Sequence, residues 1–547
     1  MTAADVIFYN GAVHPIDPEL RRSDALAVRE GRIVVLGDDV KELKGHRTEL
    51  VDLAGGALLP GFQDAHIHAV AGGLQQLGCD LEDLHSLDAY RDRIARHVAD
   101  HPDDDWIEGA GWYGDVFPGG YPHRDELDRI APGRPVVMVS HDAHGVWASS
   151  EALRRAGIDE HTPDPDGGRI LRDAGGAPTG MLVESAADLV TQLLPAPDGN
   201  RLTEALLRAQ RYLHGLGITA WQDAAVGDAL AIPDTFDTYR AAAASGRLTA
   251  RVTGALWWDR DEGMDQLDRL RARREAAADG TFRATAVKIM QDGVCENLTA
   301  AVLHPYHGQD HNTGLSFIEP AELARIVARL DAERFDLHLH AVGDRAVREC
   351  LDALATCAGP IWDHRHQLAH IDLIHPDDIV RMRDLGVTAN LQPLWAREDR
   401  VLVETKLPYL TGEQQEHHFA FGALWRAGIP IALGSDWPVS SPAPLWGIHT
   451  AVNRTAPRDD PHAQDTHAQH VPLLPGEALD LSVALHGYTA GAARANRLED
   501  ISGTLRPGMM ADLVVLDDDP FAVPATGLGS LRVRATMVGG AFTHEAW

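Results

Sequence analysis

Much of the chain repeats one pattern, an amphipathic helical stretch followed by a short apolar run. In residues 202–225, Leu206, Ala209 and Leu213 share one helical face, Gly217 ends the helix, and ITAWQD follows as an extended segment. The same unit recurs over three further segments, residues 319–344, 375–393 and 421–436. Helices that alternate with buried strands are typical of parallel α/β proteins.

Eight helix-linked strands are expected in total, and they indicate a (β/α)₈ barrel of the TIM type over residues 61–499. The expected strands are residues 61–68, 218–224, 250–257, 285–291, 336–341, 365–371, 387–392 and 430–436. In such a barrel the chemistry takes place at the carboxyl ends of the strands.

Two regions depart from this pattern. Residues 1–60 and 500–547 consist of short apolar runs separated by turns, so we expect the two chain ends to form one small β-sandwich domain. Residues 69–200 are too long for a simple connection after the first barrel strand and are rich in Trp, Tyr, Gly and Pro. We expect an insertion over the active-site mouth, although a folded decoration with no role in binding would have the same composition.

Composition narrows the class of protein. The 547 residues carry a formal net charge of -32, which argues against a nucleic-acid partner and against binding to an anionic membrane surface. Four cysteines without a CxxC pair form no disulfide framework, and the first residues lack a signal-peptide pattern, so a cytoplasmic protein is expected. The expected partner is a small-molecule substrate, and a homo-oligomer stays open.

The first expected strand ends in GFQDAHIHAV, where His66 and His68 are one residue apart. Alternate residues of a strand face the same side, so these imidazoles can bind one cation together or pack as two core histidines. Four further strand ends carry candidate ligands, namely Lys288, His340, His370 and Asp436. Each alone could be a turn or capping residue, but their joint occurrence favours a metal centre.

Six segments resemble the amidohydrolase superfamily: PGFQDAHIH, VKIMQDG, HLHAVGDRAV, HQLAHIDLI, IALGSDWPV and GTLRPGMMADLVVLD. Within it the chain is similar to amidohydrolase family 3, in the branch that includes N-substituted formamide deformylases. This resemblance extends over nearly the whole chain and implies a metal-dependent hydrolase built on a (β/α)₈ barrel.

The resemblance also implies one or two divalent cations, with zinc the expected ion. Two ligand sets follow from it by position, one of His66, His68 and Asp436 and another of His340 and His370. Lys288 would bridge the two metals as a carbamate, because an ammonium group has no lone pair with which to bind a metal. The apolar neighbours of Lys288 would favour the neutral amine, which is the form that reacts with CO₂. An unmodified Lys288 would leave a single metal, bound by histidines and Asp436.

Hydroxide generated on the metal is the expected nucleophile, because a divalent cation lowers the pKa of its bound water. Asp436 would accept the proton of that water and pass it to the leaving nitrogen, unless it serves as a ligand only. We therefore expect cleavage of a C–N bond in an amide, formamide or cyclic amide. The alternatives are deamination, decarboxylation or isomerisation at the same site, and a non-catalytic binding protein.

Four residues are weaker candidates for substrate binding, and each is also explained by a purely structural role: His144, Glu184, Cys295 and Trp395. Cys295 lies in DGVCENLTAAV, where the family usually has small residues and Ser, so it could reshape the pocket. A nucleophilic Cys295 is not expected, because hydroxide on the metal leaves it no necessary task. The histidine-rich segment around His462 is expected to be a solvated loop.

Overall fold

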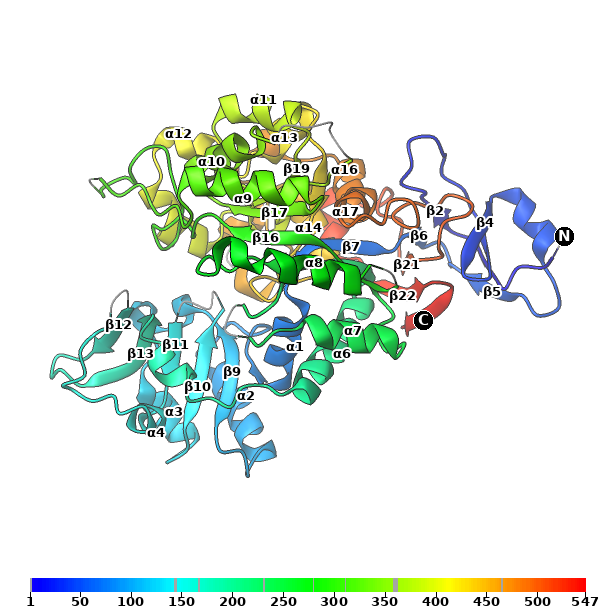
Figure 1. Ribbon diagram of the computed structural model, residues 1–547. Helices are drawn as coiled ribbons and strands as arrows, with labels where there is room; N and C mark the ends of the chain where they lie inside the picture. Colours follow the sequence, from blue (N-terminus) through cyan, green and yellow to red (C-terminus); the bar gives the residue numbers. More distant parts are fainter. Residues whose placement is uncertain are drawn as a thin grey trace.

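The computed structural model describes residues 2–141, 145–165, 168–229, 232–278, 280–309, 311–357, 363–463 and 466–547. Its centre is a parallel sheet of eight strands that curves into a barrel (Figure 1). In order around the barrel the strands are β7 (Phe62–Ile67), β14 (Ile218–Val226), β15 (Arg251–Trp257), β16 (Phe282–Met290), β17 (Asp336–Ala341), β18 (Gln367–His370), β19 (Thr388–Leu391) and β20 (Ile431–Leu433). All eight expected strands are present, and the predicted fold class is confirmed.

Helices lie between the barrel strands and also follow the last of these strands. They are α1 (Ala69–Leu77), α6 (Gly199–Gly215), α7 (Phe236–Ala244), α8 (Leu267–Ala276), α9 (Pro320–Ala332), α10 (Asp344–Leu354), α11 (Pro376–Asp384), α12 (Gly412–Glu416), α13 (Phe421–Arg426), α14 (Pro444–Asn453), α15 (Thr466–His470), α16 (Leu481–His486) and α17 (Ala492–Ala495). Among the described residues, no helix has the length and apolar character needed to span a membrane.

Helix α9 shows why these segments fold as they do. Pro320 occupies its first turn, where a missing N–H costs nothing, and the Glu319 carboxylate accepts hydrogen bonds from the backbone N–H groups of Ala321 and Glu322. The apolar residues spaced along one face are buried, namely Leu323, Ile326, Val327 and Leu330. The cap fixes the start of the helix and the apolar face docks it on the barrel.

The insertion after β7 is a separate α/β lobe below the barrel in Figure 1. Its six-stranded sheet has the order β12 (Gly168–Arg172), β13 (Pro178–Glu184), β11 (Gly145–Ala148), β10 (Val136–Ser140), β9 (Ile107–Trp112) and β8 (Cys79–Asp80). Its helices are α2 (Leu87–Asp100), α3 (Arg124–Ile130), α4 (Ser150–Arg155) and α5 (Asp188–Thr191). Trp112, Phe117 and Trp147 are buried together in the lobe, so much of its aromatic content forms its own core.

The N-terminal and C-terminal segments of the chain lie in one domain, to the right of the barrel in Figure 1. One sheet contains β4 (Arg32–Leu36), β3 (Leu26–Arg29), β1 (Val6–Tyr9) and β5 (Glu49–Asp52). The other contains β2 (Ala12–Val13), β6 (Ala57–Pro60), β21 (Leu513–Leu516), β22 (Val533–Val538) and β23 (Ala541–Glu545). Because β21 pairs antiparallel with β6, the second sheet is built from both chain ends.

Candidate metal centre

Side chains from the carboxyl ends of several barrel strands meet in one buried cluster. His66, His370 and Asp436 each offer one nitrogen or oxygen atom, and these atoms lie within 4.8 Å of one another. The Oδ1 atom of Asp436 lies 3.3 Å from Nε2 of His66 and 3.1 Å from Nε2 of His68. The Nζ atom of Lys288 lies 3.5 Å from Nε2 of His66. Strands β7, β16, β18 and β20 thus contribute to one site.

His340, at the end of β17, borders this cluster. Its ring centroid lies 4.6 Å from that of His370, and its Nδ1 atom lies 2.9 Å from Oδ1 of Asp292. The carboxylate of Asp292 also accepts hydrogen bonds from the backbone N–H groups of Val342 and Gly343. Asp292 therefore orients the imidazole and leaves Nε2 as the nitrogen available to a metal.

Burial controls the protonation of the cluster. It lowers the pKa of His66 and of His370 well below the usual range, and it lowers the pKa of Lys288 to about 8. Burial acts to raise the pKa of Asp436, but the interactions with His68, His370 and Lys288 outweigh it and the net shift is downward. At neutral pH His66 and His370 are therefore neutral and Asp436 is ionised, the protonation states that bind divalent cations.

Two further features of the site fit a bound cation. Among the described residues, the buried Oδ1 atom of Asp436 has no hydrogen-bond partner, although imidazole nitrogens of His66 and His68 lie close to it. His370 and Asp436 have φ angles of 79° and 58°, and residues other than glycine adopt this left-handed conformation mainly where the surroundings enforce it, often at functional sites. Imidazole and carboxylate groups suit zinc and neighbouring metals, so the residues present fit a divalent cation.

Trp395 is a proposed substrate-binding residue that contacts this cluster in the structure. Its ring is stacked on that of His370, with centroids 5.4 Å apart and planes 8° from parallel. Its Nε1 atom donates a hydrogen bond to Oγ of Ser440, 3.0 Å away. The indole is therefore held flat against a candidate metal ligand.

The other three substrate-binding candidates lie elsewhere or outside the described residues. Glu184, at the end of β13, accepts a hydrogen bond of 3.1 Å from Nδ2 of Asn297, which joins the insertion to the loop after β16. Cys295 is fully buried among apolar side chains, and burial raises the pKa of its thiol. His144 lies outside the residues that the structure describes. Of the three, Glu184 lies at a contact between lobe and barrel.

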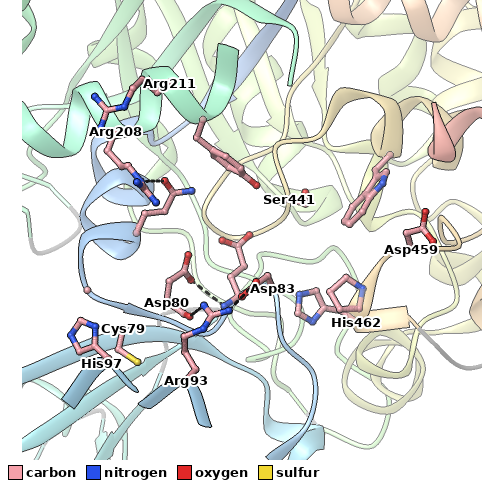
Figure 2. A pocket seen from close by; sticks show the side chains of 16 residues that line it. Cys79, Asp80, Asp83, Arg93, His97, Arg208, Arg211, Ser441, Asp459 and His462 are labelled. Atoms are coloured by element: carbon pink, nitrogen blue, oxygen red, sulfur yellow. Dashed lines mark hydrogen bonds and ion pairs between the residues drawn. The ribbon is translucent and has the colours of Figure 1, made fainter. Parts of the chain in front are cut away.

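A cavity of about 710 Å³ lies between the insertion, α6 and the segment after β20 (Figure 2). Its lining includes Asp80, Glu82, Asp83, Arg93, Tyr212 and His462. Glu82 accepts a hydrogen bond of 3.3 Å from Nε1 of Trp437, the residue after Asp436, and burial raises the pKa of Glu82 to about 8. Trp437 therefore connects Glu82, a residue of the cavity lining, to the chain segment that carries Asp436.

His462 corrects one expectation from the sequence. Instead of belonging to a solvated loop, it is half-buried and its ring stacks on that of Tyr113 in the insertion, with centroids 3.8 Å apart. Its Nδ1 atom lies 3.1 Å from Nδ1 of His85, another insertion residue. A row of apolar residues in this segment would have predicted that it packs on the insertion. Its contacts are instead made by aromatic and polar side chains, which are equally common in solvated loops.

Sequence reasoning missed the residues that orient the candidate metal ligands. The Nδ1 atom of His66 lies 2.8 Å from Nε2 of His338, and Nδ1 of His370 lies 2.9 Å from Oε1 of Gln392. Asp292 is in the VKIMQDG segment and His338 in HLHAVGDRAV, so both lay within recognised motifs. Their contacts cross between strands, and spacing along one strand does not reveal them.

Comparisons with known proteins agree with this fold. The model of the amidohydrolase family matches residues 49–544, so the chain belongs to that family and is a hydrolase of the metal-dependent amidohydrolase superfamily. The Arabidopsis thaliana protein LONG AFTER FAR-RED 3 is 31% identical over 98% of this chain and 91% of its own length. N-substituted formamide deformylase of Arthrobacter pascens is 29% identical over 99% of this chain and 98% of its own.

A solved structure shows the same architecture. An uncharacterized metal-dependent hydrolase from Pyrococcus horikoshii superposes with a TM-score of 0.73 at 24% sequence identity, over 95% of this chain and 99% of that one. At this identity the likeness concerns the fold alone. The overall fold of this chain therefore resembles one known from experiment.

Proposed function

We propose that this chain hydrolyses the C–N bond of a small amide, formamide or cyclic amide, using one or two divalent cations, with zinc the favoured ion. The proposal rests on the buried cluster of His66, His370 and Asp436, which lies beside Lys288. The similarity to an N-substituted formamide deformylase makes N-substituted formamides the first substrates to test.

The roles of the residues follow from their positions and protonation. His66, His68 and Asp436 would hold one cation, and His340 and His370 a second. Bound there, a divalent cation supplies a water of lowered pKa and polarises the substrate carbonyl.

The remaining steps belong to the protein's own side chains. The lowered pKa of Asp436 keeps its carboxylate ionised at neutral pH, so it can accept a proton from water and deliver it to the leaving nitrogen. Lys288 is buried and its pKa is lowered to about 8, which favours the neutral amine that forms a bridging carbamate with CO₂. Trp395, flat against His370, would form one wall of the substrate site.

The test combines elemental analysis with product detection. Purified protein is analysed for zinc per chain and then incubated with N-substituted formamides, simple amides and cyclic amides. Formate plus a free amine, or the acid and amine of another amide, supports the proposal. Ammonia from an amino-substituted ring identifies deamination, CO₂ identifies decarboxylation, and a zinc-loaded protein that cleaves none of these amides overturns the proposed substrate class.

A further inference from the structure

A continuous chain of hydrogen bonds crosses the barrel interior from His66 to His370. His338 lies 2.8 Å from His66 and 2.6 Å from Oε1 of Gln222. Three more links continue the chain: Gln367 to Gln222 at 2.8 Å, Asn390 to Gln367 at 2.8 Å, and Gln392 to Asn390 at 3.1 Å. Gln392 then meets Nδ1 of His370 at 2.9 Å. We call His338, Gln222, Gln367, Asn390 and Gln392 the interior chain, and all five are buried.

One backbone carbonyl fixes the direction of every link. Nδ2 of Asn390 lies 2.8 Å from the carbonyl oxygen of Ala65, which can only accept, so the nitrogen of this amide must face it. The second hydrogen of that nitrogen points to Oε1 of Gln367, which leaves Nε2 of Gln367 to donate to Oε1 of Gln222. Reversing any one amide would set two donors or two acceptors against each other.

The direction of the chain determines the tautomers at both of its ends. Oε1 of Gln222 accepts from Nδ1–H of His338, so Nε2 of His338 is an acceptor for Nδ1–H of His66. At the other end, Nε2 of Gln392 donates to Asn390, so its Oε1 accepts from Nδ1–H of His370. Each ligand histidine then keeps its lone pair on Nε2, the atom that faces the cluster.

We propose that the interior chain is a positioning device that fixes His66 and His370 as Nδ1–H tautomers together, so that a break at its middle weakens metal binding at both histidines. The inference rests on the metal centre of the proposed function but not on the identity of the substrate. Gln367 is the decisive member, because within the described part of the chain its side chain hydrogen-bonds to Gln222 and Asn390 and to neither candidate ligand.

The test measures zinc affinity by competition with a chromophoric chelator, in the absence of substrate. Gln367→Met removes both links at nearly constant volume and is expected to weaken zinc binding about 10- to 100-fold, the usual cost of losing groups that orient metal ligands. Gln367→Glu keeps the acceptor for Asn390 and is expected to retain part of the affinity.

The matched control is Gln63→Met. Gln63 is another fully buried barrel glutamine, but its side chain bonds to Ser502 and Asn496 instead of the interior chain. The Gln63→Met substitution is expected to lower the unfolding temperature and to leave zinc affinity unchanged. Equal affinity in wild type and Gln367→Met, or equal losses in Gln367→Met and Gln63→Met, would overturn the proposal.

A second pair of variants covers the case in which Gln367→Met does not fold. Gln392→Glu keeps an acceptor for Nδ1–H of His370, whereas Gln392→Leu removes it, so the Leu variant is expected to bind zinc more weakly than the Glu variant. Equal affinities of this pair would contradict the assigned tautomer. Normal zinc affinity without amide cleavage would count against the proposed reaction and leave the interior chain standing.

Discussion

At the scale of single residues, we propose two tasks for Asp436, because its carboxylate is both a candidate metal ligand and the proposed proton acceptor. Asp436→Asn keeps the shape of the side chain but removes the charge and the basic oxygen. We expect kcat to fall by about 10²- to 10⁴-fold, the usual contribution of general acid–base catalysis, and zinc affinity to fall as well. Steady-state kinetics at saturating zinc measure this loss, with Asp39→Asn, an exposed carboxylate far along the sequence, as control. A kcat near that of wild type would place the proton acceptor elsewhere.

Lys288 poses a different question at the same scale, since its side chain can bridge two metals only after its amine has reacted with CO₂. Growth or incubation with ¹³C-labelled bicarbonate is expected to give a carbamate carbon signal in the NMR spectrum of the wild-type protein. The signal should be missing in Lys288→Ala, whose metal content should fall from near two to near one per chain. Absence of the signal from a fully active wild-type protein would exclude the bridged site.

At the scale of elements, the barrel could be predicted because short strands alternate with amphipathic helices and five of the eight strands carry a candidate metal ligand near their carboxyl ends. The strands that carry His340 and His370 are buried along their whole length although half of their residues are polar, so the helices before and after them were needed to recognise them as barrel strands. The insertion could not be predicted in this way, because its sheet order brings β8 beside β9 and β13 between β11 and β12. The roles of Gln367 and Asn390 were not predicted either, because they depend on hydrogen bonds to residues on neighbouring strands.

Helix α9 offers a test of local structure that leaves the site intact. Glu319→Ala removes the carboxylate that accepts from the first N–H groups of the helix. The expected cost is about 1 kcal/mol in the free energy of unfolding, as for other helix caps. Urea denaturation measures it, with Glu322→Ala on the same helix as control, and zinc affinity should not change. A loss of zinc affinity would mean that the cap also positions β17 and His340.

At the scale of the whole molecule, stability and chemistry are placed at opposite ends of the barrel strands. The metal cluster lies at the carboxyl ends, whereas Arg251 begins β15 at the other end and pairs with Asp512, just before β21. The sequence predicted that the chain ends would join, but not this ion pair, because its two members are 261 residues apart.

This ion pair gives the last prediction. The Asp512 side chain is 2% exposed and accepts from Nε and Nη2 of Arg251 and from the backbone N–H of Gly539. Asp512→Ala would leave a largely buried guanidinium without its partner, so we expect the free energy of unfolding to fall by about 3 to 5 kcal/mol. The double variant Arg251→Met, Asp512→Leu removes both charges and should lose less than Asp512→Ala alone. Urea denaturation measures the stability of the single and the double variant. Zinc affinity shows whether either variant disturbs the candidate metal centre at the other end of the barrel. Unchanged stability in Asp512→Ala would show that the terminal domain is held by its strand pairing and apolar packing, and a fall in zinc affinity would show that the two ends of the barrel are coupled.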